Sequence, residues 1–280
     1  MKRIDINDWV LSGGGARGVS YFHKTNPDIM LKFDNGDVPV EVMEHEIAVS
    51  RQAYNLGIPS PEPGEVVTDG ERFGTIYTRI RNKVSFAREL ADHPEKVDEL
   101  ARTYAEMVKS LHNTVCTDKD VRDVKEVYRE AILDNPVEKE EIKKKALKLL
   151  ESLPDGNSCL HGDLHFGNVI LADGKTFFID MGNFAQGNPL FDLSMIFCVD
   201  RMAATEPEHF MNNYHCKPEI SHRFLNVFVK SYFGENSETE DIFKRLRPYI
   251  ALRVLTMETE VGRAVPDSAK DYVFDIFDEI

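Results

Sequence analysis

The hydrophobic pattern of the chain changes near residue 80, and this change constrains the fold more than any other feature. Before it, short runs of β-branched and aromatic residues are separated by Gly and Pro, which is typical of strands and turns. After it, apolar residues recur at helical spacing, beginning with Val97, Leu100, Tyr104, Val108 and Leu111. The pattern predicts an α+β protein with a boundary between residues 80 and 81.

The first eighty residues predict a small antiparallel sheet with one helix. Strands are expected at residues 10–11, 21–23, 29–33, 65–68 and 74–80. Residues 40–54 place Met43, Ile47 and Tyr54 at roughly helical spacing, and Gly57 follows as a favoured residue beyond a helix C-terminus. This segment therefore predicts the single helix of the first region.

The second region predicts mainly helices with one β interruption. Helices are expected over residues 97–111, 121–131 and 142–153, and again from about residue 190 to the end. Between them, residues 159–160, 169–171 and 177–179 read as short strands. Polar residues concentrate around this β interruption.

Charge and cysteine content limit the partners and the compartment. The formal net charge is −14 at pH 7, which disfavours a general nucleic-acid or anionic-membrane surface. The four cysteines are widely spaced and predict reduced thiols. Neither an apolar signal core nor a run of membrane-spanning length is present in the sequence. We therefore expect a cytoplasmic protein without nucleic-acid or membrane partners, and the oligomeric state stays open.

The tightest polar constellation lies in the β interruption. Residues 161–168 read HGDLHFGN, and Asp180 follows in FFIDMG at the end of a predicted strand. Phosphoryl transfer needs a carboxylate that orients the attacking hydroxyl and oxygen ligands for Mg²⁺. Asp163, Asn168 and Asp180 can supply these groups. The spacing of five residues from Asp163 to Asn168 equals that of the protein-kinase catalytic loop.

On these residues the chain resembles the aminoglycoside phosphotransferase and choline kinase-like superfamily, which comprises small-molecule kinases of the protein kinase-like fold. The resemblance spans nearly the whole chain. It implies two lobes: residues 1–80 would bind the nucleotide, and residues 81–280 would form a catalytic and substrate-binding helical lobe. It also implies that Asp163 is the catalytic carboxylate, that Asn168 and Asp180 bind Mg²⁺, and that His161 and Asp192 support the loop.

The same resemblance assigns the contacts to ATP or GTP. Lys32 matches the lysine that contacts nucleotide phosphates, and Glu46 matches its ion-pair partner. Residues 76–80 match the hinge whose backbone pairs with the base, through Thr78 and Ile80, with Tyr77 behind the base. The glycine-rich segment fits a flap whose backbone N–H groups cover the phosphates; its glycines are Gly13, Gly14, Gly15 and Gly18.

The acceptor is constrained only by charge. Residues 267–280 contain one Lys against five acids, which suits a cationic substrate such as an aminoglycoside-like amino sugar. Asp271, Asp275 and Asp278 are the candidate recognition residues. Choline-like amines, sugars, amino alcohols and a peptide hydroxyl stay open as acceptors.

Three alternatives compete with a small-molecule kinase. A catalytically silent nucleotide-binding module would use the same donor site. Residues 11–18, LSGGGARG, resemble the oxyanion loop of patatin-like acyl hydrolases, but the sequence contains neither G-x-S-x-G nor the D-G-G/A aspartate of such enzymes. His161, Asp163 and His165 alternate in sequence and would share one face of an extended strand, as in a zinc site.

Overall fold

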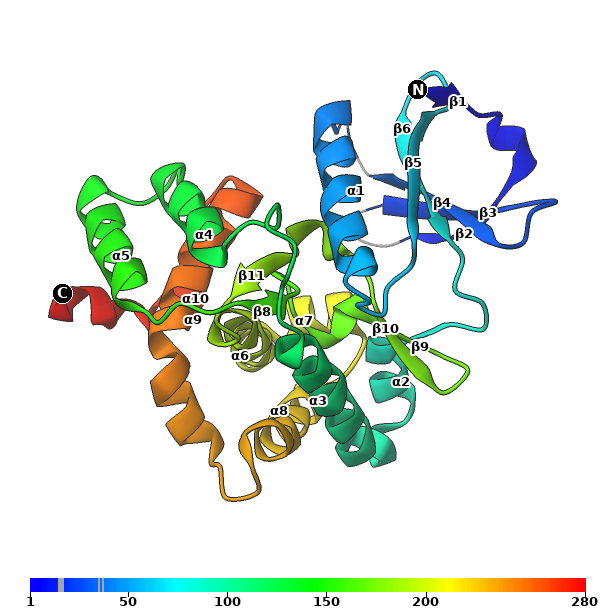
Figure 1. Cartoon of the computed structure of the whole chain (residues 1–280). Coiled ribbons are helices and arrows are strands. Elements are labelled where there is room, and N and C mark those ends of the chain that lie inside the picture. Colours follow the sequence, from blue (N-terminus) through cyan, green and yellow to red (C-terminus); the bar gives the residue numbers. More distant parts are fainter. Residues whose placement is uncertain (15–17, 35, 37) are drawn as a thin grey trace. The chain divides into compact units, whose positions relative to one another are not determined.

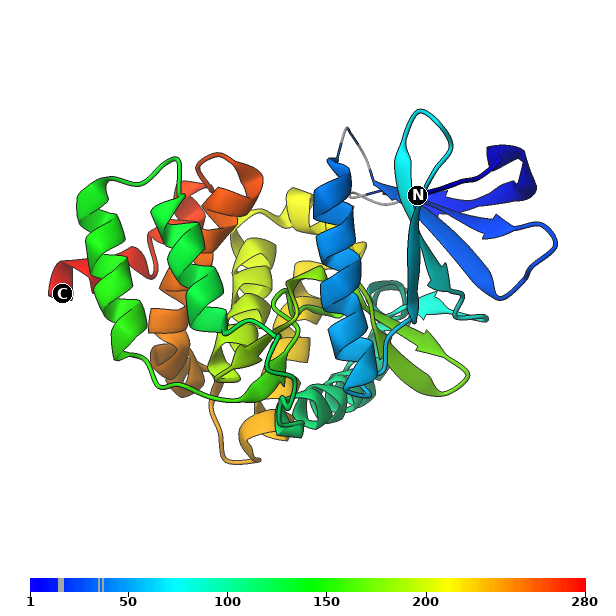
Figure 2. The same cartoon turned by 45° about the horizontal axis from the view of Figure 1, so that its top comes forward.

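The computed structural model describes residues 1–14, 18–34, 36 and 38–280. The chain divides into two compact units, which are drawn in Figures 1 and 2. Unit 1 contains residues 1–85 and 168–184, and unit 2 contains residues 86–167 and 185–280. The predicted division at residue 80 put residues 168–184 in the second region, but they belong to unit 1. The reason is that the strand at 169–172 pairs with residues 84–85 of unit 1.

Unit 1 is built on a six-stranded sheet of order β1-β5-β6-β4-β3-β2. Its strands are β1 (Lys2–Arg3), β2 (Trp9–Gly14), β3 (Gly18–His23), β4 (Ile29–Asp34), β5 (Pro63–Thr68) and β6 (Phe73–Thr78). A short 3-10 helix, η1 (Ile6–Asp8), precedes β2. The neighbouring strands pair antiparallel as predicted, except that β1, which the pattern missed, pairs parallel with β5.

The alternation of side chains along β4 determines what each face of the sheet carries. Leu31 and Phe33 are buried in a core cluster with Trp9 and Val67. Because successive strand residues point to opposite faces, Lys32 projects away from this cluster. Strand β4 therefore supplies apolar core on one face and one cation on the other.

Helix α1 (Val40–Asn55) packs against β5 and β6, and both cartoon views show it alongside the sheet (Figures 1 and 2). Met43 and Ile47 are buried as the helical spacing predicts. Tyr54 is 39% exposed, so its assignment to the buried face was wrong. The buried face passes through Ala53 at this last turn, and Tyr54, one residue further, lies about 100° away around the helix axis.

The second sheet of unit 1 has the order β10-β9-β7. Its strands are β7 (Val84–Ser85), β9 (Val169–Ala172) and β10 (Lys175–Phe178). Asp173 and Gly174 join β9 to β10, and both have positive φ, as a tight hairpin turn requires. The 3-10 helix η4 (Met181–Asn183) follows the hairpin and packs against α1.

Unit 2 is mainly helical. Its helices are α2 (Phe86–Asp92), α3 (Val97–Asn113), α4 (Val124–Leu133), α5 (Glu140–Ser152), α6 (Leu190–Thr205), α7 (Pro207–Tyr214), α8 (Pro218–Phe233), α9 (Thr239–Val261) and α10 (Asp267–Lys270). Strands β8 (Ser158–Leu160) and β11 (Ala185–Gly187) form a two-stranded antiparallel sheet. Three 3-10 helices are η2 (Pro94–Lys96), η3 (Phe166–Asn168), which spans the unit boundary, and η5 (Phe274–Glu279).

The core of unit 2 centres on α3, α6, α8 and α9. The Tyr104 ring on α3 contacts the rings of Phe224 and Phe228 on α8 edge to face, at centroid distances of 5.4 and 5.6 Å. Helix α6 is buried along most of its length and packs against α9. Within the described part of the chain, no helix combines the length and the apolar character needed to cross a bilayer.

Candidate active site

Lys32 is the centre of an ionic cluster in unit 1. Its Nζ lies 3.0 Å from Oδ1 of Asp180, 3.5 Å from Oδ1 of Asp34 and 3.7 Å from Oε1 of Glu46. The Lys32 side chain is only 17% exposed. Burial alone would lower the pKa of Lys32, but the three carboxylates, Asp180 foremost, raise this pKa above its ordinary value. The ammonium therefore stays charged at neutral pH.

Asp180 reaches this cluster from the end of the β9–β10 hairpin. Its backbone lies in the left-handed region, with φ 57° and ψ 51°, which is uncommon for a non-glycine residue and occurs often at functional sites. The N–H of Ile179 donates to the carbonyl of Asn168 at 2.9 Å. Asn168 and Asp180 therefore flank the open end of one hairpin.

The absence of a side chain at Gly182 leaves room for the Glu46 side chain of α1 in the cluster. A Cβ atom at Gly182 would lie 2.6 Å from Cγ of Glu46, so a larger residue would push the glutamate aside. Tyr77 on β6 places its hydroxyl 3.5 Å from Oε1 of Glu46. Burial, followed by the Glu46 carboxylate, raises the pKa of Tyr77, which keeps its phenol neutral.

Of the glycine-rich segment, Gly13 and Gly14 lie at the end of β2, and Gly18 begins β3. Gly13 and Gly14 pair with Ser20 and Val19, so strand β2 extends further than the predicted turn from residue 12. A Cβ at Gly18 would lie 2.3 Å from the carbonyl oxygen of Phe33, because β3 and β4 approach closely there. Gly15 lies outside the described residues. Strand β3 follows the segment, where the patatin-like fold has a helix.

The predicted hinge residues lie at and beyond the end of β6. The Thr78 N–H donates to the carbonyl of Glu62 at 2.9 Å, so this N–H is already engaged within unit 1. Ile80 follows the strand, and the Arg79 N–H donates to the carbonyl of Asp28. Pairing of Thr78 and Ile80 with a nucleotide base stays a prediction.

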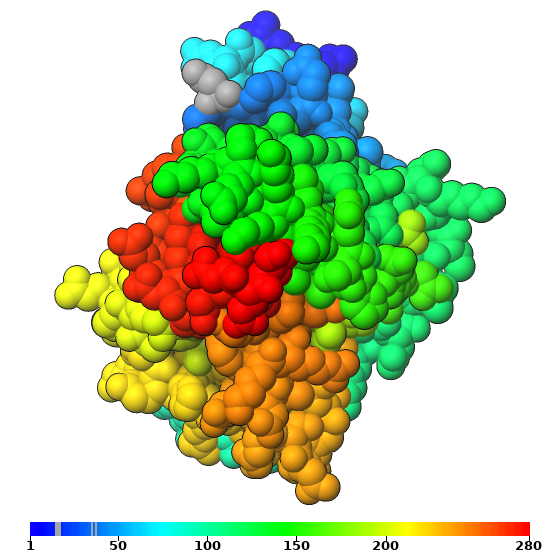
Figure 3. All heavy atoms as spheres, turned by 90° about the vertical axis from the view of Figure 1, so that its left-hand side faces the viewer, coloured from blue at the N-terminus to red at the C-terminus, as the bar shows by residue number. Residues whose placement is uncertain are grey.

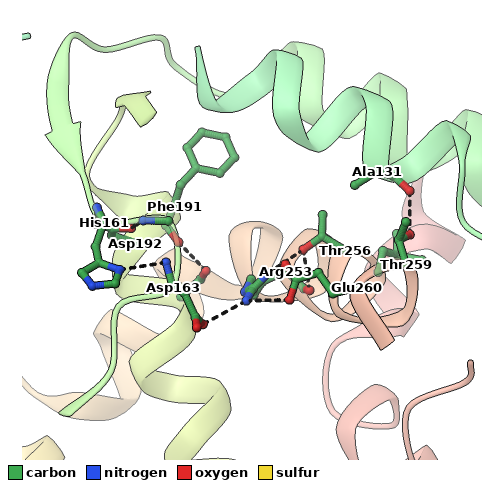
Figure 4. Close-up of polar contacts among 12 residues, drawn as sticks. Ala131, His161, Asp163, Phe191, Asp192, Arg253, Thr256, Thr259 and Glu260 are labelled. Carbon is green, nitrogen blue, oxygen red and sulfur yellow. Dashed lines mark hydrogen bonds and ion pairs between the residues drawn. The ribbon is translucent and has the colours of Figure 1, made fainter. Parts of the chain in front are cut away.

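In unit 2, the loop after β8 is anchored by Asp192. The N–H of His161 donates to Oδ2 of Asp192 at 2.6 Å, and the N–H of Gly162 donates to Oδ1 at 2.8 Å (Figure 4). Gly162 has φ 81°, a conformation that favours glycine. Nε2 of His112 lies 3.1 Å from the same carboxylate. Asp192 lies in the first turn of α6, where its carboxylate binds the loop and makes no cap hydrogen bond to that helix.

Asp163 is nearly buried in this loop, at 3% exposure. Its N–H donates to Nδ1 of His161 at 3.3 Å, and its Oδ2 lies 3.7 Å from Nε2 of His165. Nδ1 of His165 accepts the N–H of Gly167. Ring nitrogens that accept backbone N–H groups cannot bind a metal as well, and the described residues contain no group of three or more His, Cys, Asp or Glu side chains arranged for a metal ion. The geometry thus gives the zinc alternative no support.

A further contact of Asp163 was missed from the sequence. Nη2 of Arg253 on α9 lies 3.2 Å from Oδ1 of Asp163 (Figure 4). Arg253 stands within an apolar stretch of its helix, between Leu252 and Val254. A lone charge in such a stretch signals a buried ion pair, although the sequence does not identify the partner.

The acidic C-terminal segment packs against other parts of unit 2. In Figure 3 this segment, in red, lies at the surface beside α5 (green) and α9 (orange). Asp275 forms an ion pair with Arg247 of α9, and Lys145 Nζ of α5 donates to the carbonyl of Phe277 at 2.8 Å. Asp271 and Asp278 are exposed. A role in substrate recognition stays a prediction for Asp271, Asp275 and Asp278.

The fold is α+β and protein kinase-like. Unit 1 has a sheet with one helix and carries the Lys32 cluster, and unit 2 is mainly helical. The chain belongs to the phosphotransferase enzyme family (APH), whose family model matches residues 9–215. A search of curated proteins gives no match.

Solved structures share this fold. A choline/ethanolamine kinase family protein from Mesorhizobium loti is 15% identical, with coverage of 96% of this chain and 87% of that chain and a TM-score of 0.57. A thermostable mutant of aminoglycoside phosphotransferase APH(4)-Ia, in a ternary complex with ADP and hygromycin B, is 16% identical, with coverage of 97% and 92% and a TM-score of 0.60. Aminoglycoside phosphotransferase APH(3'')-Id from Streptomyces rimosus, in complex with ADP and streptomycin, is 19% identical, with coverage of 89% and 92% and a TM-score of 0.55.

Proposed function

We propose that this protein transfers the γ-phosphate of ATP or GTP to a hydroxyl group of a small molecule. Membership of the phosphotransferase enzyme family supports the reaction class. The single observation that carries the proposal is the Lys32 cluster, a mostly buried ammonium among three carboxylates. An arrangement of this kind suits the binding of a nucleoside triphosphate together with a divalent cation.

On the donor side, Lys32 contacts the phosphates and Glu46 holds the lysine in place. An ammonium has three N–H donors, so Lys32 can keep one carboxylate partner while it donates to phosphate oxygens. The β2–β3 hairpin covers the phosphates with backbone N–H groups of Gly13, Gly14, Gly15 and Gly18. Thr78 and Ile80 contact the base.

Asp180 and Asn168 fit a magnesium ion. Both offer hard oxygen ligands, and Mg²⁺ usually takes one or two protein ligands together with phosphate oxygens and waters. The carboxylates around Lys32 outnumber its single positive charge, which also favours a divalent cation. When bound, Mg²⁺ supplies electrostatic stabilisation of the charge on the transferred phosphoryl oxygens.

On the acceptor side, Asp163 orients the attacking hydroxyl. As the new P–O bond forms and the bond to the leaving nucleoside diphosphate breaks, Asp163 receives the proton of the hydroxyl. Asp192 and His161 support the loop that carries it. Transfer is direct and needs no covalent enzyme intermediate.

An aminoglycoside-like amino sugar is the first acceptor to test. The negative net charge and the acidic C-terminal segment favour a cationic substrate. Asp271 and Asp278 are the exposed candidates for its recognition, whereas Asp275 would have to exchange its ion pair with Arg247. The same charge supports the proposal of no nucleic-acid or membrane partner. The four cysteines, all free thiols in the structure, support the proposal of a cytoplasmic location.

The test is a nucleotide-consumption screen with Mg-ATP and Mg-GTP over aminoglycosides, amino alcohols and sugars. We expect consumption that depends on one acceptor class, and a loss of at least about 100-fold in Asp163→Asn. Asp200→Asn is the matched control, because Asp200 is a mostly buried carboxylate of the same unit that accepts the hydroxyl of Ser221 at 3.0 Å. A melting point raised by Mg-nucleotide without consumption for any acceptor would instead indicate a silent module.

A further inference from the structure

Arg253 is a buried cation on α9 whose side chain is 3% exposed. A charge removed from water is costly unless well-placed partners compensate it. Two carboxylates do so here, Asp163 and Glu260, and Figure 4 shows the guanidinium between them. The Arg253 side chain therefore links the loop after β8 to the C-terminal end of α9.

The contacts of Arg253 are unequal. Glu260 accepts from both terminal nitrogens, from Nη1 through Oε1 and from Nη2 through Oε2 at 3.2 Å. Asp163 accepts only from Nη2, at 3.2 Å. Because a bidentate pair fixes the plane of a guanidinium, Glu260 sets the direction in which Arg253 meets Asp163.

Thr256 completes the arrangement. Its hydroxyl donates to the Arg253 carbonyl at 2.9 Å, so its oxygen accepts from Nη1 at 3.1 Å. The guanidinium is thus held by two residues on the same face of its own helix. An arginine with so little freedom can fix the carboxylate that it contacts.

We infer that Arg253 and Glu260 are positioning residues that hold the Asp163 carboxylate in one orientation for the acceptor hydroxyl. This inference rests on the proposed function. Arg253 binds Oδ1 of Asp163, whereas Oδ2 faces His165, so the two oxygens have different surroundings. In phosphoryl transfer, catalysis comes mainly from positioning and charge stabilisation rather than from basicity.

Glu260 has a second consequence for the charge on Asp163. It shares the guanidinium, so Asp163 does not receive the whole charge of Arg253. Glu260 is also 41% exposed, which makes it the solvent-facing member of the three. Removing its charge should loosen the plane of the guanidinium while Arg253 keeps its contact with Asp163.

The test compares Arg253→Met with a control that loses a similar ion pair elsewhere on α9. Lys270 Nζ lies 2.5 Å from Oε1 of Glu258, a fully buried residue of α9, and 2.5 Å from Oε1 of Glu138. Lys270→Met therefore removes a cation from buried carboxylates without touching Asp163. Both variants should melt at lower temperature than the parent protein.

The kinetic readout separates positioning from stability. With the acceptor found in the screen, Arg253→Met should lower kcat about 100-fold, as a small misplacement of a reacting group does. Its KM for the nucleotide should change less than about threefold, because the nucleotide is not among its partners. Lys270→Met should keep kcat within about threefold. Equal losses of kcat in the two variants, or full activity of Arg253→Met, would overturn the inference.

A double variant tests whether Arg253 acts through Asp163. If it does, Asp163→Asn with Arg253→Met should be no slower than Asp163→Asn alone. Multiplied losses would contradict a positioning role. Glu260→Gln should lie between the parent protein and Arg253→Met in kcat, and parent-like kcat would remove Glu260 from the assignment.

A crystallographic readout keeps the inference separate from the proposed function. If none of the acceptors in the screen leads to consumption of nucleotide by the parent protein, the proposed function fails. The crystal structure of Arg253→Met still decides the inference in that case. The Asp163 carboxylate should rotate in that variant and keep its orientation in Lys270→Met. An unmoved Asp163 in Arg253→Met would overturn the inference.

Discussion

Replacing Asp192 by alanine should destabilise unit 2 and release the loop that carries Asp163. Asp192 is 2% exposed and accepts from the backbone N–H groups of His161 and Gly162 and from the His112 ring. Nδ1 of His112 lies 2.8 Å from the hydroxyl of Tyr232, so a neutral His112 that accepts there donates from Nε2 to Asp192. Alanine removes all three acceptor contacts at once.

The magnitude follows from the kind of contact that is lost. Each hydrogen bond to a charged group is worth about 1.5–3 kcal/mol, and an unsatisfied buried donor costs about 1–3 kcal/mol. Since such losses do not add fully, we expect the free energy of unfolding to fall by roughly 3–5 kcal/mol. For a unit of this size, each kcal/mol shifts Tm by about 2–4 °C. The melting temperature of Asp192→Ala should thus fall by roughly 6–20 °C.

The assay is urea unfolding together with a thermal melt of matched variants. Asp192→Asn keeps one acceptor oxygen and should fall between the parent protein and Asp192→Ala. Asp200→Asn, on the same helix, is the control; burial raises the pKa of Asp200, so the loss of its charge should cost less than about 1 kcal/mol. The reasoning is refuted if Asp192→Ala unfolds at the same urea concentration as Asp200→Asn.

Three further predictions concern the glycines and the tyrosine network. Gly18→Ala should destabilise unit 1 by about 1–3 kcal/mol in urea unfolding because its Cβ would meet a backbone carbonyl, whereas Gly13→Ala, with nothing within 4 Å, should be neutral. Gly182→Ala should displace Glu46 and weaken Mg-nucleotide binding by about tenfold in calorimetry, and unchanged affinity would contradict the role of Glu46. Burial, followed by the charge of Asp192, raises the pKa of Tyr232 from 10.0 to about 12; its neutral phenol therefore stabilises the fold fully below pH 10, and this contribution is lost between pH 10 and 12. Tyr232→Phe should flatten the fall in stability over this range, and a parallel curve would exclude the assignment.

The elements of unit 1 could be predicted because their patterns are local. The strand over residues 29–33 was predicted from its apolar run, and in the structure its alternation places Leu31 and Phe33 in the core and Lys32 on the other face. Helix α1 followed from the spacing of Met43 and Ile47. Strands β1 and β11 were missed since two or three residues carry no detectable period.

The contacts that connect distant segments could not be predicted from spacing. Arg253 and Asp163 are 90 residues apart, and His112 and Asp192 are 80 residues apart. A single sequence shows that Arg253 is a charge among apolar residues but not which acid satisfies it. The loop motif predicted Asp163 as a site residue because its residue types are close in sequence, whereas Arg253, which contacts Asp163, comes from α9.

The contacts described for Lys32 lie within unit 1, and those described for Asp163 and Arg253 lie within unit 2. Buried charges require partners close by, so each cluster has compensation inside its own unit. A substitution of Glu46 should therefore change nucleotide affinity, and a substitution of Glu260 should change kcat, with little effect of either on the other quantity. Since the two effects act on separate steps, the pair Glu46→Gln and Glu260→Gln should give multiplied losses in kcat/KM. Losses that do not multiply would mean that the two clusters act as one unit in the reaction.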